Sequence, residues 1–325
     1  MLNQLNIDQA RDYIHKVHGV LPVPPKSYLV LFSPRSGSNL LCSYLERAGL
    51  GRPVEAFHTS KTYRAGLNWK IDFADPFAYL FKAIEYQTIG GVLGMKLNFG
   101  QFELFLRNAR ALLEGSGIAL GDHELVEVFF PGVKYIHIQR KGKIKQAISE
   151  TKALQTGVWL ENEEGTPTIY TALYDREHIE RCFDFLLAED VAWEYYLSHH
   201  QLPYLLVWYE DLVEEPEIKM HEIYQYLDFS GKELAPSPLR RQSNLQSSAW
   251  EKRFREETAW LQENNLEAAL AEGDLTGLLV QRCRMVFGDR QVQRFWSMPA
   301  TRSREIRSLF FRGKRKVKKI LHLQA

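Results

Sequence analysis

A short run of small, polar and basic residues, placed between an apolar strand and a helix, is the part of this chain best suited to bind an anion. It comprises Ser33, Pro34, Arg35, Ser36, Gly37, Ser38 and Asn39. Backbone N–H groups at a helix N-terminus face a bound anion, and the helix dipole favours negative charge there. Gly37 permits close backbone approach, and the Arg35 guanidinium matches phosphate or sulfate oxygens. The run therefore predicts a site for a phosphate- or sulfate-containing ligand.

This run does not follow the Walker A pattern GxxxxGK[ST]. That pattern places a Lys directly after its second Gly and a Ser or Thr for Mg²⁺ after the Lys. Here the basic residue comes before Gly37, and Ser38 follows it. The run therefore argues against an ordinary nucleoside triphosphatase and favours a phosphate-type ligand held without that metal arrangement. A strand-to-helix turn with ordinary caps is the alternative.

A loop soon after the helix contains a candidate general base. It comprises Arg52, Pro53, Val54, Glu55, Ala56, Phe57 and His58. The Glu55 carboxylate can take a proton from a hydroxyl, with Phe57 and His58 lining a pocket. A solvated loop glutamate is the alternative for Glu55. His58 is a second candidate base, and a surface or packing histidine is its alternative.

Three further segments carry charged groups near predicted strand ends. Arg140 follows a strand, and Ser149 lies on the next helix, where the two can hold a second phosphate. A basic helix start without a ligand is the alternative. Glu210 and Asp211 resemble a Walker B metal site, but we interpret them as structural because no matching Walker A run exists. Arg241 lies in a Pro-flanked basic loop that either closes over an anion or is a charged surface loop.

The pattern of elements predicts an α/β fold with a mostly parallel sheet flanked by helices. Apolar runs predict strands at 28–32, 91–97, 133–138 and 204–208. Apolar residues at helical spacing predict helices at 7–17, 39–48, 75–86, 101–113, 123–130, 143–155 and 177–199, and another from Pro216. Strands that alternate with helices indicate βαβ units, whose ligands lie at the carboxyl ends of the strands. That edge should gather residues 33–39, Lys96, Arg140 and Glu210.

Length and composition indicate one large domain, alone or with an appendage. The chain has 325 residues, of which 45% are hydrophobic and 25% charged, enough for a sizeable core. A net charge of +1 gives no indication of nucleic acid binding. The three cysteines, Cys42, Cys182 and Cys283, are too scattered for a disulfide framework or a zinc site. Because the sequence shows no signal peptide and no membrane-length apolar stretch, a reduced cytoplasmic setting is expected.

In combination, these motifs resemble the bacterial sulfotransferase family typified by trehalose 2-sulfotransferase, whose members use 3′-phosphoadenosine 5′-phosphosulfate. The family pattern S-x-R-S-G-S matches 33–38, P-x-E-x-F matches 53–57, and GxKL matches 94–97. H-I-x-R matches 137–140, Q-A-x-S matches 146–149, and A-x-Q-T-x-V-W matches 153–159. Arg-Gln at 241–242 and W-x-x-R-[YF]-R at 250–255 complete the resemblance, which spans residues 28–256.

The resemblance implies a P-loop-like sulfotransferase fold and assigns roles within it. It makes Glu55 the general base, with Arg35 neutralising the bridging oxygen and Lys96 assisting. The 5′-phosphosulfate would be held by Ser33, Arg35, Ser36, Gly37, Ser38 and Asn39. The 3′-phosphate would be held by Arg140, Ser149 and Arg241. Pro34 and residues 52–58 would face the acceptor, and no metal is required.

The same resemblance predicts the organisation and partners of the chain. It delimits a sulfotransferase domain at 28–256, and the residues outside the match form an N-terminal lead-in at 1–27 and a helical C-terminal extension at 257–325. The expected partner is a sugar or glycolipid acceptor, with no nucleic acid, and a homodimer is left open. Family members that act on trehalose carry Gln where this chain has Pro34, and residues from 257 on have no family counterpart. The acceptor is therefore not fixed as trehalose.

Residues 301–325 form a basic tail with apolar residues at helical spacing. Such a tail either lies on an anionic membrane surface or is solvated or docked on the body, and we favour the second interpretation. Two alternatives to a sulfotransferase also stay open. One is a Mg²⁺-dependent small-molecule kinase on a P-loop-like sheet, and the other is a non-catalytic nucleotide or polyanion binder.

Overall fold

A computed structural model describes residues 4–58, 75–159, 171–229 and 245–258 of the chain. Its centre is a five-stranded sheet in the order β2-β3-β1-β4-β5. The strands are β1 (Lys26–Phe32), β2 (Thr88–Ile89), β3 (Val92–Leu97), β4 (Lys134–Gln139) and β5 (Tyr204–Trp208). β1 pairs in parallel with β3 and β4, β4 pairs in parallel with β5, and only the short β2 runs antiparallel within this sheet. The predicted α/β class with a mostly parallel sheet is confirmed.

The central strand β1 is buried on both faces because its apolar residues are continuous. Val30 packs with helices on one side of the sheet, and Leu29 and Leu31 pack with helices on the other. All three side chains are fully buried. A strand with an apolar run of this kind belongs in the middle of a parallel sheet, since successive side chains point to opposite faces.

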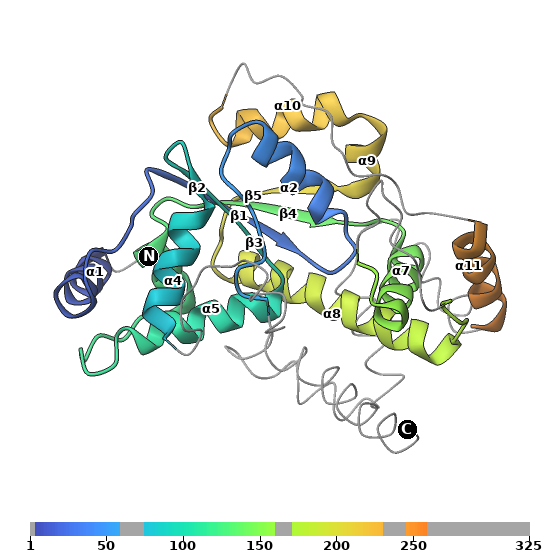
Figure 1. Cartoon of the computed structure of the whole chain (residues 1–325), viewed down its shortest axis with the longest axis horizontal. Coiled ribbons are helices and arrows are strands. Elements are labelled where there is room, and N and C mark those ends of the chain that lie inside the picture. Colours follow the sequence, from blue (N-terminus) through green and yellow to red (C-terminus); the bar gives the residue numbers. More distant parts are fainter. Residues whose placement is uncertain (1–3, 59–74, 160–170, 230–244, 259–325) are drawn as a thin grey trace.

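Helices cover both faces of the sheet (Figure 1). Over one face lie α2 (Ser38–Arg47), α9 (Tyr209–Glu214) and α10 (Pro216–Tyr226). Over the other lie α4 (Pro76–Gln87), α5 (Phe99–Ala111) and α8 (Arg176–His199). The remaining helices of the described residues are α1 (Gln4–His18), α6 (Asp122–Phe129), α7 (Lys143–Thr156) and α11 (Leu245–Glu257). Helix α7 packs on α8 and α11, beyond the carboxyl ends of the strands (Figure 1).

Polar caps start the helices that position the site. The Asp75 carboxylate accepts hydrogen bonds from the first N–H groups of α4, as an N-cap residue should. Asn98 and Gln101 form a reciprocal capping box at the start of α5. This box begins α5 at Phe99, two residues before the predicted start, and it brings the Gln101 side chain to the carboxyl end of β3.

Helix α1, within the expected N-terminal lead-in, packs into the main core. Ile7, Ala10 and Ile14 are buried in the same cluster as the inner residues of β1 and β3. Arg11 Nε also donates to the carbonyl oxygen of Val128 at 3.1 Å. The expected boundary after residue 27 therefore marks no break in packing.

Several predicted features lie outside the described residues. These are Arg241 and the basic loop around it, Cys283, most of the 257–325 extension and the 301–325 tail. Within the described ranges, no helix combines the length and the apolar composition needed to cross a membrane.

Candidate active site

The segment between β1 and α2, residues 33–37, is a tight turn that we call the anion loop. The Ser36 N–H donates to the Ser33 carbonyl oxygen at 3.2 Å and closes the turn. Arg35 and Gly37 have left-handed backbones with φ of 63° and 90°. Gly37 is the residue before α2, and no side chain caps the first N–H groups of that helix. Those N–H groups are therefore available to a ligand.

Ser36 adds a second indication that the anion loop is built to hold a polar group. Its side chain is fully buried. Among the described residues, its hydroxyl oxygen has no hydrogen-bond partner. A buried hydroxyl without a partner costs free energy, so such groups call for an explanation. A phosphate or sulfate oxygen at the start of α2 would supply the missing partner.

The segment carrying Glu55 extends the edge of β3 near its carboxyl end. Val54 forms a parallel bridge with Met95, and the Lys96 N–H donates to the Val54 carbonyl oxygen at 3.4 Å. The Gln87 side-chain oxygen accepts a hydrogen bond from the Val54 N–H at 3.3 Å. Because the loop is hydrogen-bonded to β3 and α4, Glu55 is fixed beside Lys96 although the two residues are far apart in the sequence.

Lys96 joins the candidate base to the anion site. Its Nζ lies 2.8 Å from Glu55 Oε1 and also donates to Oδ1 of Asn39, in the first turn of α2. The Gln101 side-chain amide donates to Glu55 Oε2 at 2.7 Å. The Lys96 side chain is 4% exposed and that of Glu55 is 17% exposed. Both oxygens of the Glu55 carboxylate are thus bound by donors, while part of the side chain remains exposed to solvent.

Burial raises the pKa of Glu55, but the surrounding donors outweigh it. The Lys96 ammonium lowers this pKa by its charge and its hydrogen bond, and Gln101 and His58 lower it further. The net effect is a pKa below the ordinary value of 4.5. Glu55 is therefore a carboxylate at neutral pH, as a general base must be before it takes a proton.

The other residues of the 52–58 loop divide into two groups. Ala56 and Phe57 are fully buried, and the Phe57 ring packs edge-on against Tyr79 and Phe105. These side chains pack the core instead of lining an exposed pocket. Pro53 is also buried, whereas Arg52, Val54 and His58 are half-buried. An acceptor contact from this loop is thus left to Glu55 and its half-buried neighbours.

Arg35 brings the anion loop together with two residues of the expected 3′-phosphate element. Its Nε donates to the Ser149 hydroxyl at 2.9 Å, and its NH1 donates to the Trp159 carbonyl oxygen at 2.5 Å. Arg140 NH1 donates to the carbonyl oxygen of Arg35 at 3.4 Å. Arg35, Arg140 and Ser149 therefore form one cluster, as expected for strand ends at one edge of the sheet.

The acidic pair at the start of α9 has structural contacts. Glu210 accepts hydrogen bonds from the N–H groups of Lys141 at 2.9 Å and Gly142 at 3.1 Å, the two residues that precede α7. Asp211 pairs with Lys141 Nζ at 2.5 Å. Nowhere in the described ranges do three or more His, Cys, Asp or Glu side chains gather in a way that could hold a metal ion. These contacts support the structural interpretation of Glu210 and Asp211.

Three residues at the site were not singled out from the sequence. Gln101 holds Glu55, Gln146 contacts the anion loop, and the Tyr209 ring lies 4.8 Å from the Arg140 guanidinium. The Asn98-x-x-Gln101 capping pattern is the one signal that could have placed Gln101 at a helix start. Gln146 begins the Q-A-x-S match at 146–149, which is the signal that could have found it, whereas nothing in the local sequence distinguishes Tyr209 from a core residue.

Comparison with known proteins agrees with this geometry. Residues 27–257 match the sequence profile of the family described as Stf0 sulphotransferase, so the chain belongs to that family. The trehalose 2-sulfotransferase of Mycolicibacterium smegmatis is 30% identical over 260 residues, which cover 71% of this chain and 95% of the relative. The trehalose 2-sulfotransferase of Mycobacterium tuberculosis is 27% identical over 259 residues, with the same coverage.

The family predicted from the motifs is thereby confirmed. A solved structure, the sulfotransferase domain from the Synechococcus PCC 7002 olefin synthase, also aligns with the chain. It is 18% identical, has a TM-score of 0.33, and the alignment covers 72% of this chain and 89% of that one. This likeness is too weak to support a conclusion by itself.

Proposed function

We propose that this protein transfers a sulfuryl group from 3′-phosphoadenosine 5′-phosphosulfate to a hydroxyl of a carbohydrate or glycolipid. Membership of the sulphotransferase family supports the reaction class. The observation that carries the proposal is the Lys96 ammonium, which contacts both the Glu55 carboxylate and Asn39 in the first turn of α2. The Lys96 side chain thus connects the candidate base, Glu55, to the proposed anion-binding site at the start of α2.

The anion loop fits the 5′-phosphosulfate end of this donor. The uncapped N–H groups of α2 and the buried Ser36 hydroxyl offer donors to its oxygens, and Arg35 offers a positive charge. Ser33, Ser38 and Asn39 complete the proposed contacts. Bound there, the donor supplies the activated sulfuryl group for transfer.

The 3′-phosphate is assigned to Arg140 and Ser149, together with Arg241 from outside the described residues. Arg140 stacks on Tyr209 and contacts the backbone of Arg35, which holds its guanidinium beside the anion loop. The Ser149 hydroxyl oxygen accepts a hydrogen bond from Arg35 Nε, so the proposal requires this hydroxyl to be shared between Arg35 and the nucleotide. A basic cluster that binds the 3′-phosphate would select this donor over ATP, because ATP has no phosphate at that position.

In the proposed reaction, Glu55 accepts the proton of an acceptor hydroxyl while that oxygen forms a bond to sulfur. The bond between sulfur and the bridging phosphate oxygen breaks, and its electron pair leaves with adenosine 3′,5′-bisphosphate. Arg35 and Lys96 stabilise the negative charge that collects on the sulfuryl and bridging oxygens. Because Glu55 is a weak base for an alcohol, proton removal must accompany attack; such help is typically worth about 10²- to 10⁴-fold.

A sugar acceptor is supported by the two curated relatives, both of which bear the name trehalose 2-sulfotransferase. The acceptor would lie along Pro34 and the half-buried part of the 52–58 loop. Pro34 has no side-chain amide to donate to a sugar hydroxyl, in contrast to the Gln expected of trehalose-specific relatives. We therefore propose a carbohydrate or glycolipid acceptor without assigning trehalose.

The alternatives receive less support. A Mg²⁺-dependent kinase needs metal ligands, but the Glu210 carboxylate already bonds the backbone just before α7, and the Asp211 carboxylate pairs with Lys141. A non-catalytic polyanion binder leaves the Glu55–Lys96–Gln101 arrangement without a role.

The decisive experiment combines binding with transfer. Calorimetry without Mg²⁺ should show binding of adenosine 3′,5′-bisphosphate in preference to ATP. A panel of carbohydrates and glycolipids should then be incubated with labelled donor, and mass spectrometry of any product would locate the sulfate. Preference for ATP would reject the donor, and donor binding without transfer to any hydroxyl compound would favour the non-catalytic alternative.

A further inference from the structure

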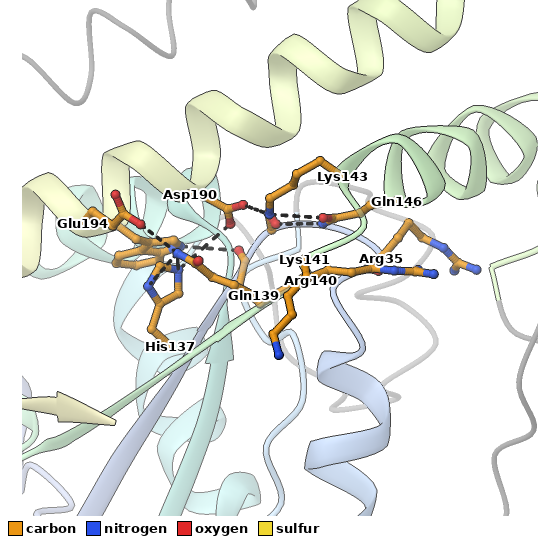
Figure 2. Close-up of polar contacts among 12 residues, drawn as sticks. Arg35, His137, Gln139, Arg140, Lys141, Lys143, Gln146, Asp190 and Glu194 are labelled. Atoms are coloured by element: carbon orange, nitrogen blue, oxygen red, sulfur yellow. Dashed lines mark hydrogen bonds and ion pairs between the residues drawn. The ribbon is translucent and has the colours of Figure 1, made fainter. Parts of the chain in front are cut away.

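A chain of buried polar side chains runs from helix α8 to the anion loop (Figure 2). Lys143 Nζ forms an ion pair with Asp190 and donates to Gln146 Oε1 at 3.2 Å. Gln146 Nε2 in turn donates to the Ser33 hydroxyl at 2.9 Å and the Pro34 carbonyl oxygen at 2.7 Å. Lys143 is 3% exposed, and Asp190 and Gln146 are fully buried. None of these three side chains takes part in the proposed sulfuryl transfer.

The charge on Asp190 is balanced by Lys143 and not by the neighbouring histidine. His137 Nε2 lies 4.0 Å from Asp190 Oδ1. Burial lowers the pKa of His137 to about 4, against the opposing charge of Asp190, so this ring is neutral at pH 7. A buried ion pair is weak evidence for stability, because apolar residues of similar volume often serve as well. The best-attested use of such a pair is to fix one geometry among several.

The pair fixes which way the Gln146 amide points. An ammonium has donors and no acceptor, so it can meet only the oxygen of the amide. With Oε1 toward Lys143, the NH₂ group must face the anion loop, where it meets the oxygens of Ser33 and Pro34. Reversing the amide would set its NH₂ against the ammonium and its oxygen against the Pro34 carbonyl oxygen. Both contacts would then be repulsive.

This amide sets the direction of the next backbone N–H. The peptide between Pro34 and Arg35 is trans, so its N–H points away from its carbonyl oxygen. Since Gln146 holds that oxygen toward α7, the Arg35 N–H is turned the opposite way. Arg35 also has a left-handed backbone, with φ of 63°, which a residue with a side chain adopts only when its surroundings hold it there.

We propose that Gln146, oriented by the Lys143–Asp190 pair, is a positioning residue that holds the anion loop in its ligand-binding conformation. The residue acts on the donor through the loop backbone and need not touch the donor itself. The proposal deepens the proposed function, and its donor-binding consequence rests on that function. Its structural consequence, the conformation of the ligand-free loop, does not.

Hydrogen–deuterium exchange of the ligand-free protein tests the structural consequence. The variants are Gln146→Leu, which removes the amide, and Gln146→Glu, which keeps an acceptor for Lys143 but cannot donate to the loop. Thr151→Val is the matched control, because Thr151 is buried on the same helix and its hydroxyl bonds the Ala147 carbonyl within α7. Both Gln146 variants should speed exchange of peptides covering residues 33–37 by about tenfold, as expected for local opening of a turn that has lost its supporting bonds.

The pattern of exchange decides the outcome. Acceleration confined to the anion loop supports a positioning role. Acceleration spread evenly over the sheet, or loop exchange equal to that of Thr151→Val, overturns the proposal.

Calorimetry with adenosine 3′,5′-bisphosphate separates this proposal from the proposed function. Gln146→Leu and Gln146→Glu should bind this ligand about tenfold more weakly than the wild type and Thr151→Val, matching the loss of one or two hydrogen bonds in the loop. Wild-type affinity in both Gln146 variants would overturn the positioning role. A wild type that fails to bind the bisphosphate would reject the donor assignment, while the exchange experiment would still decide the role of Gln146.

Discussion

The backbone of Gly37 lies directly against the ring of Tyr209. A Cβ atom added at Gly37 would come within 2.2 Å of Tyr209 Cδ2, closer than any real contact of this kind. The Arg140 guanidinium faces the same ring at 4.8 Å. One aromatic side chain at the start of α9 thus supports the anion loop and the arginine proposed to bind the 3′-phosphate. The loop and this arginine should respond together to changes at Tyr209.

Gly37→Ala is expected to weaken both folding and donor binding. At φ of 90° an alanine is strained, and the new methyl group must also displace the Tyr209 ring. Gly132→Ala is the matched control, since Gly132 has φ of 62° but no atom within 4 Å of an added Cβ. The control should lose only the strain, about 1–2 kcal/mol of unfolding free energy. Chemical denaturation and bisphosphate binding should show a larger loss in Gly37→Ala, and equal losses would mean that the Tyr209 contact is unimportant.

Glu55→Gln should preserve donor binding and abolish most turnover. The amide keeps the size of the carboxylate but cannot accept the acceptor proton, so kcat should fall by about 10²- to 10⁴-fold. Glu222→Gln serves as control, because Glu222 pairs with Lys219 on the surface of α10 and neither residue is assigned to the reaction. Steady-state kinetics and bisphosphate calorimetry are the measurements. An unimpaired rate in Glu55→Gln would exclude the assigned base.

Lys96→Met should raise the pH at which activity is lost on the acid side. In the wild type the pKa of Glu55 lies below the ordinary value of 4.5. The ionised carboxylate therefore stabilises the folded protein, and can act as the base, at any pH above about 4.5. This contribution of ionised Glu55 is lost as the pH falls through its lower, folded-state pKa. Without the ammonium, burial dominates and raises the pKa of Glu55. The acid limb of kcat/KM should therefore move upward in Lys96→Met, and an unchanged limb would show that Glu55 does not control it.

Arg140→Lys should impair recognition of the 3′-phosphate specifically. Lysine cannot reproduce a planar guanidinium stacked on Tyr209 and directed at the loop backbone. Affinity for adenosine 3′,5′-bisphosphate should fall about tenfold, the cost of one hydrogen bond to a charged group, while affinity for AMP changes little. Arg176→Lys, in an exposed pair with Glu180, is the control. Equal losses for both nucleotides would place Arg140 elsewhere than at the 3′-phosphate.

The basic tail at 301–325 can be tested independently of the reaction. Under the favoured interpretation, the full chain and a chain ending at residue 300 should float equally with vesicles of anionic lipid. Stronger flotation of the full chain, reduced by added salt, would instead establish a membrane-surface role, because screening weakens attraction to anionic lipid. Vesicles of neutral lipid are the control.

The fold was largely predictable because its central strands carry a strong signal. β1, β3 and β4 are buried on both faces and mostly apolar in their middle, with His137 and Lys96 as the charged or polar exceptions in β4 and β3, so their positions follow largely from composition. β2 has two residues and α9 has six, too few for any periodicity to emerge. Helix α9 also follows β5 directly, which makes its first residues look like the end of that strand. Helix α11 buries Trp250 and Phe254 but is otherwise polar, and no helix was expected there.

The site was predictable where charge and topology coincide. Lys96 and Arg140 follow or end apolar strands, so a parallel sheet must bring them to the anion loop. Gln101 was not predictable as a site residue, because an uncharged amide has no distinctive sequence context. Gln146 lies in the matched Q-A-x-S motif, but the motif did not reveal its contact with the anion loop. Their partners at the site lie 46 and 112 residues away along the chain. Contacts over such distances appear only once the fold is known.

The packing of α1 bears on how the protein can be produced in shortened form. A fragment starting at the family boundary near residue 27 would lack Ile7, Ala10 and Ile14. The core residues that these side chains cover would then form a solvent-exposed hydrophobic patch. It would also leave the backbone oxygens at the end of α6 without the guanidinium of Arg11. Recombinant versions trimmed to residues 27–257 are thus prone to aggregate, and helix α1 should be kept.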